Sequence, residues 1–471
     1  MSHSDKGVPP SLRWRDALSR PNVVGHRASD LHDMREANNT LVLRVIRQHG
    51  PLARVAIARR TGLSRTTVSS IVDGLLAEGV AREGETLRAA PSGGRRPTLV
   101  HFNESAGVIL GIDFGRTHYT LLATDLHAHV LARASGPCDT DLGPDVLLPR
   151  LIAEIRRLVG ENHLDWDRVV GVGLGIPGPV DTNLNMLVTP PRMAGWDRVD
   201  IIGVLTQALG APVLLNNDAN LGALAEGRYG AALGASNFIY VKVGTGIGCG
   251  LVIDGKIYRG SNGAAGELGH FTVDRNGPLC ACDNRGCLEA VAGAPQIVRQ
   301  ALSAGYRPHG QNGHSETTTM TLMADMKSPR LEDASRAEID VAEVIESALE
   351  GDPACVFAVT QAAEQIGIAL AGLVNLFNPS VITMYGSVAR AGDLLLNPIR
   401  EAISERSLLA AAQAVRVRTS ALGDSAVALG AATVVIDAIF GPPIAIAHMT
   451  EEAEELARVE APALSAASKA D

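Results

Sequence analysis

Residues 270–289 read His-Phe-Thr-Val-Asp-Arg-Asn-Gly-Pro-Leu-Cys-Ala-Cys-Asp-Asn-Arg-Gly-Cys-Leu-Glu. This stretch places one imidazole and three thiols in a single loop-sized segment: His270, Cys280, Cys282 and Cys287. Tetrahedral structural Zn²⁺ prefers such a ligand set, and Gly277 and Gly286 allow so short a loop to fold back on itself. Free core cysteines are the alternative, but three of the six cysteines lie within eight residues of one another. The spacing therefore predicts a structural zinc loop.

The loop begins within Gly-Glu-Leu-Gly-His at residues 266–270 and ends in Gly-Cys-Leu-Glu at residues 286–289. This pattern resembles the signature of the ROK family of repressors, open reading frames and sugar kinases. Asp283 departs from the pattern, because the family usually has glycine there, but aspartate tolerates a left-handed backbone better than most residues. The resemblance covers roughly residues 36–440. It implies an α/β chain in which a winged helix-turn-helix precedes a two-lobed, actin-like (ribonuclease-H-like) sugar-kinase fold.

Composition predicts a globular protein with a basic front. The chain has 471 residues, 46% hydrophobic and 20% charged, enough for two or three domains. Residues 1–100 carry 16 Lys and Arg against 9 Asp and Glu, a net charge of +7, whereas the remainder carries −16. Only the N-terminal part therefore favours a polyanionic partner. We find no apolar signal core and no apolar run of membrane-spanning length, and a thiol-rich metal site favours a reducing compartment, so we expect a cytoplasmic protein with no membrane partner.

The N-terminal region reads as a DNA-binding domain. We expect a mobile arm at 1–33, a winged helix-turn-helix at 34–90 and a Gly/Arg/Pro linker at 91–104. Apolar residues recur at helical spacing from Asn38, Gly62 supplies a tight turn, and Ser64 is a natural N-cap for the third helix. Residues 80–87 are expected to form the wing. A helical protein-interaction module is the alternative interpretation.

The third helix presents short hydrogen-bonding side chains and one guanidinium away from its apolar stripe. They suit base edges and phosphates in a major groove, and the candidate DNA contacts are Ser64, Arg65, Thr66, Thr67, Ser69 and Ser70. Arg95 and Arg96 lie in the Gly/Pro-kinked linker and suit a narrow minor groove, unless the linker is a plain hinge. The expected partner is a double-stranded operator, bound by a homodimer or tetramer.

The segment 105–440 is the expected sugar-kinase-like domain, followed by a flexible tail at 441–471. A strand, a Gly-rich turn and a second strand occur at residues 108–124 and again at 238–253, which suggests two related lobes that face each other over a nucleotide cleft. Backbone N–H groups of such turns can approach phosphate closely. The candidate nucleotide-binding residues are Asp113, Gly115, Thr117, Gly244, Thr245, Gly246, Gly248 and Gly386. ATP with Mg²⁺ is the cofactor that the resemblance to kinases implies, beside the structural Zn²⁺.

Asp218 stands where an apolar strand leads into a helix. A carboxylate at such a junction can accept a proton from a sugar hydroxyl, although a plain helix N-cap is the alternative. The resemblance implies that Asp218 is the catalytic base if the protein is a kinase. It implies sugar contacts at Asn217, Asp218, Glu267, His270 and Glu289, so that His270 would serve both zinc and sugar.

Several positions depart from the kinases of the family. Arg116 and His118 replace a glycine and a lysine of the first phosphate turn, and Tyr385 replaces the first residue of the adenine-side glycine pair. Arg192 stands near the usual sugar-binding asparagine and would suit an acidic or phosphorylated ligand. We therefore interpret the chain as a DNA-binding transcriptional repressor of carbohydrate metabolism genes that responds to a sugar or sugar phosphate. The alternative is an ATP-dependent sugar kinase of the hexokinase or glucokinase type with an appended DNA-binding domain.

Overall fold

The computed structural model describes Trp14, Arg15, Leu18 and residues 31–86, 96–181, 185–188, 190, 193–308 and 340–441. The chain forms two compact units. Unit 1 comprises Met1–Val23 and Glu104–Ile436, and unit 2 comprises Val24–Asn103 and Asp437–Asp471. The expected tail lies outside the described residues from position 442 onward, and so does most of the expected arm.

Of the expected arm before Leu31, the structure describes Trp14, Arg15 and Leu18, and Arg15 bonds to a strand of unit 1. Trp14, Arg15 and Leu18 have helical backbone. The Arg15 guanidinium donates hydrogen bonds to the carbonyl oxygens of Val169 (2.6 Å) and Trp166 (2.8 Å). This part of the arm is therefore held against the start of a central strand of unit 1.

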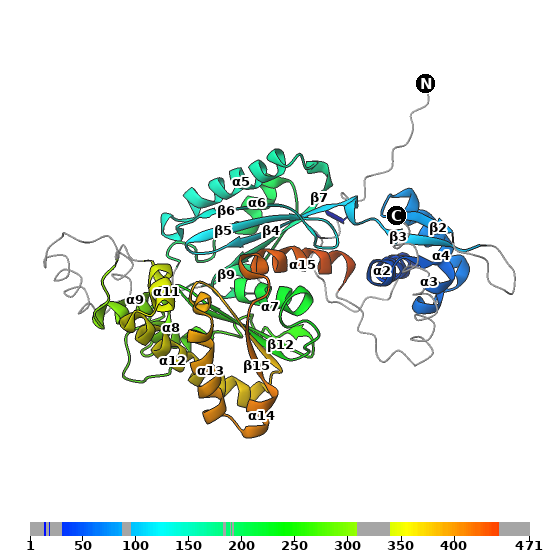
Figure 1. The fold of residues 1–471 in the computed structure, drawn as a ribbon. Helices are drawn as coiled ribbons and strands as arrows, with labels where there is room; N and C mark the ends of the chain where they lie inside the picture. Colours follow the sequence, from blue (N-terminus) through cyan, green and yellow to red (C-terminus); the bar gives the residue numbers. More distant parts are fainter. Residues whose placement is uncertain are drawn as a thin grey trace, which may run out of the picture. The chain divides into compact units, whose positions relative to one another are not determined.

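Unit 2 is a winged helix-turn-helix (Figure 1). Its elements are α2 (Leu31–His49), β1 (Leu52–Ala53), α3 (Arg54–Thr61), α4 (Arg65–Ala77), β2 (Ala81–Thr86) and β3 (Thr98–Phe102), with the strands in the antiparallel order β1-β3-β2. Gly62 has a φ of +71° at the end of α3, as a tight turn requires. The Ser64 side chain accepts a hydrogen bond from the Thr67 N–H (3.1 Å). The predicted helix-turn-helix and its Ser64 cap are thereby confirmed.

The wing and the first helix differ from the expectation. The expected linker contains β3, which pairs with β2 and carries the buried side chains of Val100 and Phe102. A run of Thr, Leu, Val, His and Phe buries alternate residues as a strand, and the glycines before it misled the sequence interpretation. Likewise, α2 begins at Leu31, inside the expected arm. The sequence interpretation began this helix too late, because its first turns are polar and lack the apolar spacing that marks a helix.

The end of α15 (Ala426–Phe440) belongs to unit 2, which differs from the expected domain boundary at 440. The Phe440 ring is fully buried and meets the Phe102 ring edge-on, with centroids 5.7 Å apart. The Arg47 guanidinium lies 5.3 Å from the Phe440 ring centroid, and Arg44 donates a hydrogen bond to the Phe440 carbonyl (2.7 Å). The last residues of α15 therefore complete the core of unit 2.

Unit 1 contains two five-stranded sheets. The first has the order β10-β7-β4-β5-β6, with β4 (Val108–Phe114), β5 (His118–Thr124), β6 (Val130–Pro137), β7 (Val169–Ile176) and β10 (Val213–Asn217). The second has the order β13-β12-β11-β14-β15, with β11 (Phe238–Val243), β12 (Ile247–Ile253), β13 (Lys256–Ile257), β14 (Val381–Tyr385) and β15 (Arg416–Thr419). In each sheet an antiparallel hairpin, β4-β5 or β11-β12, continues through a parallel neighbour, β7 or β14. The two related lobes predicted from the sequence are confirmed.

Helices cover both sheets (Figure 1). On the first sheet, α5 (Pro144–Glu161) and α6 (Ile201–Leu209) pack on one face, and α15 packs on the other. A Cβ at Gly111 or Gly173 would lie 2.0 Å from a carbonyl oxygen of α15, so these glycines allow the helix to approach the sheet backbone closely. On the second sheet, α7 (Asp218–Tyr229) covers one face. The other face is covered by α8 (Leu288–Ala292), α9 (Ala294–Ser303), α11 (Val341–Glu350), α12 (Pro353–Phe377) and α13 (Asp393–Arg406), with α14 (Leu409–Ala414) following.

Among the described residues, two helical stretches have the length and apolar composition to cross a membrane, α12 and Gly423–Phe440, which the sequence did not lead us to expect. Of the apolar segment of α12, 56% is buried inside the protein, and of that of the second stretch 61% is buried. Core helices of globular proteins have the same character, because they are apolar on most sides.

Candidate functional site

A cavity of about 1140 Å³ opens in unit 1 and is lined by residues of both sheets. All five predicted sugar contacts line it: Asn217, Asp218, Glu267, His270 and Glu289. A cavity of this size exceeds the usual range for one small ligand, roughly 300–1,000 Å³. The five residues predicted from the sequence therefore lie in one cleft, although they are up to 72 residues apart in the chain.

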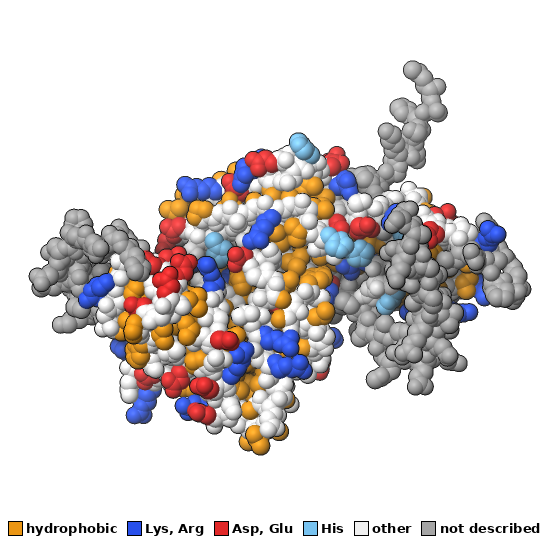
Figure 2. All heavy atoms as spheres, viewed as in Figure 1, with side chains coloured by type: hydrophobic (Ala, Val, Ile, Leu, Met, Phe, Trp, Pro, Cys, Tyr) orange, Lys and Arg blue, Asp and Glu red, His pale blue; other side chains and the backbone are white. Residues whose placement is uncertain are grey.

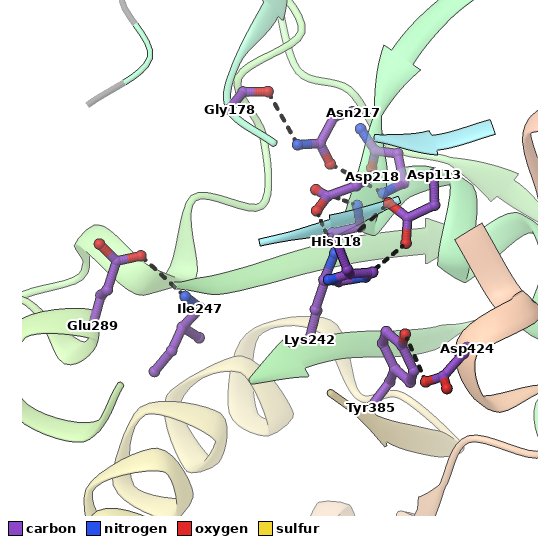
Figure 3. A network of polar contacts seen from close by, with 12 residues as sticks. Asp113, His118, Gly178, Asn217, Asp218, Lys242, Ile247, Glu289, Tyr385 and Asp424 are labelled. Carbon is purple, nitrogen blue, oxygen red and sulfur yellow. Dashed lines mark hydrogen bonds and ion pairs between the residues drawn. The ribbon is translucent and has the colours of Figure 1, made fainter. Parts of the chain in front are cut away.

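Asn217 and Asp218 occupy the junction of β10 and α7 (Figure 3). The Asn217 side chain accepts a hydrogen bond from the Asn220 N–H (3.1 Å) and donates one to the Gly178 carbonyl (3.1 Å). Asn217 is therefore the N-cap of α7, and the plain-cap interpretation of Asp218 is wrong. Asp218 is the first residue of the helix, and its Oδ1 accepts from the Ala219 N–H (2.8 Å), which leaves Oδ2 for other partners.

Lys242 is a cleft residue that the sequence interpretation missed. Its Nζ lies 2.8 Å from Asp218 Oδ2 and 4.0 Å from Asp113 Oδ1, and its side chain is only 15% exposed. Burial opposes the charged form of Lys242, but the two carboxylates outweigh it and raise the pKa of the ammonium above its ordinary value. A lone lysine in the apolar strand Phe-Ile-Tyr-Val-Lys-Val was the available signal.

Two glutamates face the cleft from the zinc-loop side. Glu289 Oε2 accepts a hydrogen bond from the Ile247 N–H (3.0 Å), so it connects α8 to the start of β12. Glu267 makes a 4.0 Å contact with His270 Nε2. Burial, followed by the negative charges of Asp218 and Glu289, raises the pKa of Glu267 to about 7. The wall that carries Glu267 and Glu289 is therefore rich in groups that can bond sugar hydroxyls.

The predicted nucleotide-binding residues divide into two sets. Those that line the cleft are Thr117, Gly244, Thr245, Gly246, Gly248 and Gly386. Asp113 and Gly115 do not line it, contrary to the prediction. The physical reason is His118, whose Nε2 lies 3.5 Å from Asp113 Oδ2 and whose ring would touch a Cβ at Gly115. Asp113 is fully buried, and although burial raises its pKa, Lys242 and His118 lower it below the ordinary value.

The other departures from kinases also have partners within the protein. Arg116 pairs with Asp141 (3.4 Å), so its guanidinium is directed to a carboxylate of the protein. The Tyr385 hydroxyl donates to Asp424 Oδ1 (3.3 Å), and its ring stacks on Tyr240 with centroids 6.1 Å apart. Arg192 lies outside the described residues.

The zinc ligands predicted from the sequence converge. His270 Nδ1 lies 3.7 Å from Cys280 Sγ, Cys282 Sγ lies 3.6 Å from Cys287 Sγ, and all four ligand atoms lie within 4.8 Å of one another. Zn–S bonds of about 2.3 Å at tetrahedral angles place sulfur atoms at such separations. Burial raises the pKa of Cys287, so its thiolate requires a cation such as Zn²⁺. These four residues fit a structural zinc ion, which would fix the loop that carries His270 into the cleft.

The backbone of the loop agrees with the sequence interpretation. Asp283 has a φ of +66° and occupies the left-handed region where the family usually has glycine. Gly286, with a φ of +67°, allows close packing, because a Cβ there would lie 1.4 Å from the Asp274 carbonyl oxygen. All six cysteines of the chain are free thiols.

The candidate DNA contacts lie at the start of α4. Arg65, Thr66 and Ser70 are exposed, whereas Thr67 and Ser69 are half-buried. The Ser64 hydroxyl contacts those of Thr66 and Thr67 (2.8 Å each) in addition to its capping bond. Arg96 is exposed just before β3, so it belongs to the wing rather than to a linker, and Arg95 lies outside the described residues. Figure 2 shows both acidic and basic side chains on the face of unit 1 that it draws.

The sequence profile of the ROK family matches residues 109–438, most of unit 1. This chain belongs to the ROK family. It is 30% identical to the xylose repressor of Caldicellulosiruptor bescii over 415 residues, which cover 87% of this chain and 98% of that repressor. The resemblance inferred from the zinc-loop pattern is thereby confirmed.

Solved structures of the family agree with both units. The crystal structure of a ROK transcriptional regulator, described as a homologue of the E. coli Mlc protein, has a TM-score of 0.69 and 27% identity, covering 87% of this chain and 97% of its own. A ROK glucokinase from Streptomyces griseus, in complex with glucose and AMPPNP, has a TM-score of 0.55 and 28% identity. It covers 70% of this ROK protein and 99% of its own chain. The regulator therefore matches a larger share of this protein than the kinase does.

Proposed function

We propose that this ROK protein is a sugar-responsive transcriptional regulator, a repressor of carbohydrate metabolism genes that acts in the cytoplasm as a homodimer or tetramer. One observation carries the proposal: a winged helix-turn-helix with an exposed recognition helix shares a chain with a sugar-kinase-like cleft. A stand-alone kinase has no use for the first of these units.

In this proposal the cleft is the sensor. Asn217, Asp218, Glu267, His270 and Glu289 bond the hydroxyls of a sugar, and a zinc ion on His270 and the three cysteines keeps that wall in place. Sugar binding closes the two lobes, and closure changes the orientation of the paired DNA-binding units. A two-fold operator fixes the spacing of its half-sites, so a small rotation weakens contacts on both halves at once.

The function is tested with duplexes from the promoter region of the protein's own gene. A melting screen over sugars and sugar phosphates first identifies the ligand, because a ligand that binds only the folded state raises the melting temperature. Fluorescence anisotropy then measures the affinity for the duplexes with and without that ligand. Retention of the duplex and a change of its affinity with the sugar are expected, and a failure to retain any duplex at low salt would overturn the proposal.

We expect Arg65→Ala to weaken operator binding. Arg65 is the first residue of α4 and is exposed, so its guanidinium can reach a base edge or a phosphate. Loss of such a contact costs about 1–3 kcal/mol, roughly a 5- to 150-fold increase in the operator Kd. Arg416→Ala, which removes an exposed arginine of β15 in unit 1, is the matched control and is expected to leave the Kd unchanged. Equal affinities of the two variants would count against α4 as the recognition helix.

A second candidate function is an ATP-dependent sugar kinase, favoured by Asp218 at the start of α7 and by the Gly-rich turn before β12. Arg116, His118 and Tyr385 oppose it, because each is directed to a carboxylate of the protein. Coupled detection of ADP release over a hexose panel tests this function. Sugar-dependent ADP release that disappears in Asp218→Asn would establish the kinase.

A further inference from the structure

Two charged groups that line the cleft, Asp218 and Lys242, meet a third, Asp113, which is buried behind the lining, and the three come from different parts of the fold (Figure 3). Asp113 belongs to β4 of the first sheet, Asp218 begins α7, and Lys242 belongs to β11 of the second sheet. The Lys242 ammonium lies between the two carboxylates, 2.8 Å from Asp218 Oδ2 and 4.0 Å from Asp113 Oδ1. The side chains of Asp113 and Asp218 are only 0% and 8% exposed, so water does little to neutralise them.

In enzymes that transfer phosphoryl groups, a divalent metal ion binds beside carboxylates such as these. Mg²⁺ bridges the phosphates and the carboxylates of the enzyme and neutralises the charge that develops on the transferred group. It requires near-octahedral oxygen ligands at about 2.0–2.1 Å. Here an ammonium already occupies one oxygen of Asp218, and Asp113 is shielded by His118. A divalent cation would lie next to a fixed positive charge, so these residues do not fit Mg²⁺.

We propose that Lys242 takes the place of the divalent metal ion in this cleft and thereby makes the site a receptor for a sugar without Mg²⁺ and ATP. This inference rests on the proposed function and deepens it, because it narrows the ligand class of the sensor to a sugar without phosphate. Lys242 is in this view a specificity-determining residue. Its ammonium pairs with Asp218 Oδ2 at 2.8 Å and so fixes the carboxylate that faces a sugar hydroxyl, while the space beside Asp218 is closed to a metal ion.

Lys242 could instead attract a phosphate, as lysines of phosphate-binding loops do. The balance of charge opposes this role. Two buried carboxylates surround the single ammonium, so Asp113, Asp218 and Lys242 together carry a charge of −1. Such a group repels an uncomplexed phosphate and is compatible with the neutral hydroxyls of a sugar.

The test is Mn²⁺ binding to the full-length protein, followed by electron paramagnetic resonance with and without AMP-PNP. The wild type and the control Lys256→Met, which removes an exposed lysine of β13, are expected to bind no Mn²⁺ that depends on Asp218. Lys242→Met keeps the length of the side chain but leaves two carboxylates without a cation. We expect it to bind Mn²⁺ at least about tenfold more tightly than the wild type, and the gain to disappear when Asp218→Asn is added.

Two results would overturn the inference. One is a Lys242→Met protein that binds Mn²⁺ no more tightly than the wild type. The other is a wild-type protein with a bound Mn²⁺, alone or with AMP-PNP, that is lost in Asp218→Asn. The second comparison does not use the Lys242 variant, so it decides the matter if that variant does not fold. Operator binding measured on the same wild-type sample separates the role of Lys242 from the proposed regulator function. If the sugar changes DNA affinity but the wild type binds Mn²⁺ through Asp218, only the role of Lys242 is overturned.

Discussion

Removal of zinc is expected to destabilise unit 1 by about 4 kcal/mol, the linkage contribution of a ligand present at about 1,000 times its Kd. His270, Cys280, Cys282 and Cys287 would hold the metal, and without it burial favours the protonated thiol of Cys287. The experiment measures bound metal by mass spectrometry and melting by calorimetry, before and after chelation. Re-addition of Zn²⁺ is expected to restore the melting temperature, and Mg²⁺ is not.

Cysteine variants make the same test without a chelator. Cys282→Ser is expected to lose the metal and to melt like the chelated protein. Cys138→Ser lies outside the loop, is also partly exposed and is the matched control. It is expected to keep the metal and the melting temperature of the wild type. Because His270 presents Nδ1 to the cysteines and Nε2 toward Glu267 and the cleft, loss of the metal is also expected to weaken sugar binding. A wild-type protein without metal, or a Cys282→Ser protein that melts like the control, would contradict a zinc site.

Phe440→Ala is expected to destabilise unit 2 by about 3–5 kcal/mol, the usual cost of deleting a buried aromatic ring. The substitution removes the edge-on contact with Phe102 and the contact with the Arg47 guanidinium, and it leaves a cavity in a small core. A small domain has only about 5–15 kcal/mol of stability in total. We therefore expect the DNA-binding unit to open while unit 1 still binds the sugar.

Hydrogen exchange measured by mass spectrometry locates this effect, because it reports the opening of each segment separately. Faster exchange is expected in α2, α4 and β3, together with a loss of operator affinity. Leu409→Ala removes a large apolar side chain of α14 that is 71% exposed, so it is expected to change stability by less than about 0.5 kcal/mol. If Phe440→Ala left exchange in β3 unchanged, Phe440 would not belong to the core of unit 2.

Features with a local cause could be predicted from the sequence. The strand–turn–strand segments predicted at 108–124 and 238–253 are observed as β4-β5 and β11-β12, because each consists of two mostly apolar runs around a turn that contains glycine. The Ser64 cap and the left-handed Asp283 follow from the preferences of single residues. The zinc loop could be identified because all its ligands lie within 18 residues.

Features that depend on distant partners could not be predicted from the sequence. Lys242 meets Asp218 24 residues away and Asp113 more than 100 residues away, so only the fold reveals the cluster. The strand β3 was interpreted as linker, because its pairing with β1 and β2 is not written in its own few residues. The end of α15 was assigned to the sugar-kinase-like domain, since nothing in Asp437–Phe440 shows that its partners are Arg44, Arg47 and Phe102.

The most direct test of the account measures the sugar affinity of the protein twice, free and saturated with operator DNA. If the sugar changes operator affinity by some factor, linkage requires the operator to change sugar affinity by the same factor. With the sugar found in the melting screen, isothermal titration is expected to give sugar Kd values that differ by about fivefold or more between the free and the operator-bound protein. Anisotropy is expected to give the same ratio between the operator Kd values without and with the sugar. Equal sugar Kd values in the free and the DNA-bound protein would contradict a cleft that controls the DNA-binding unit.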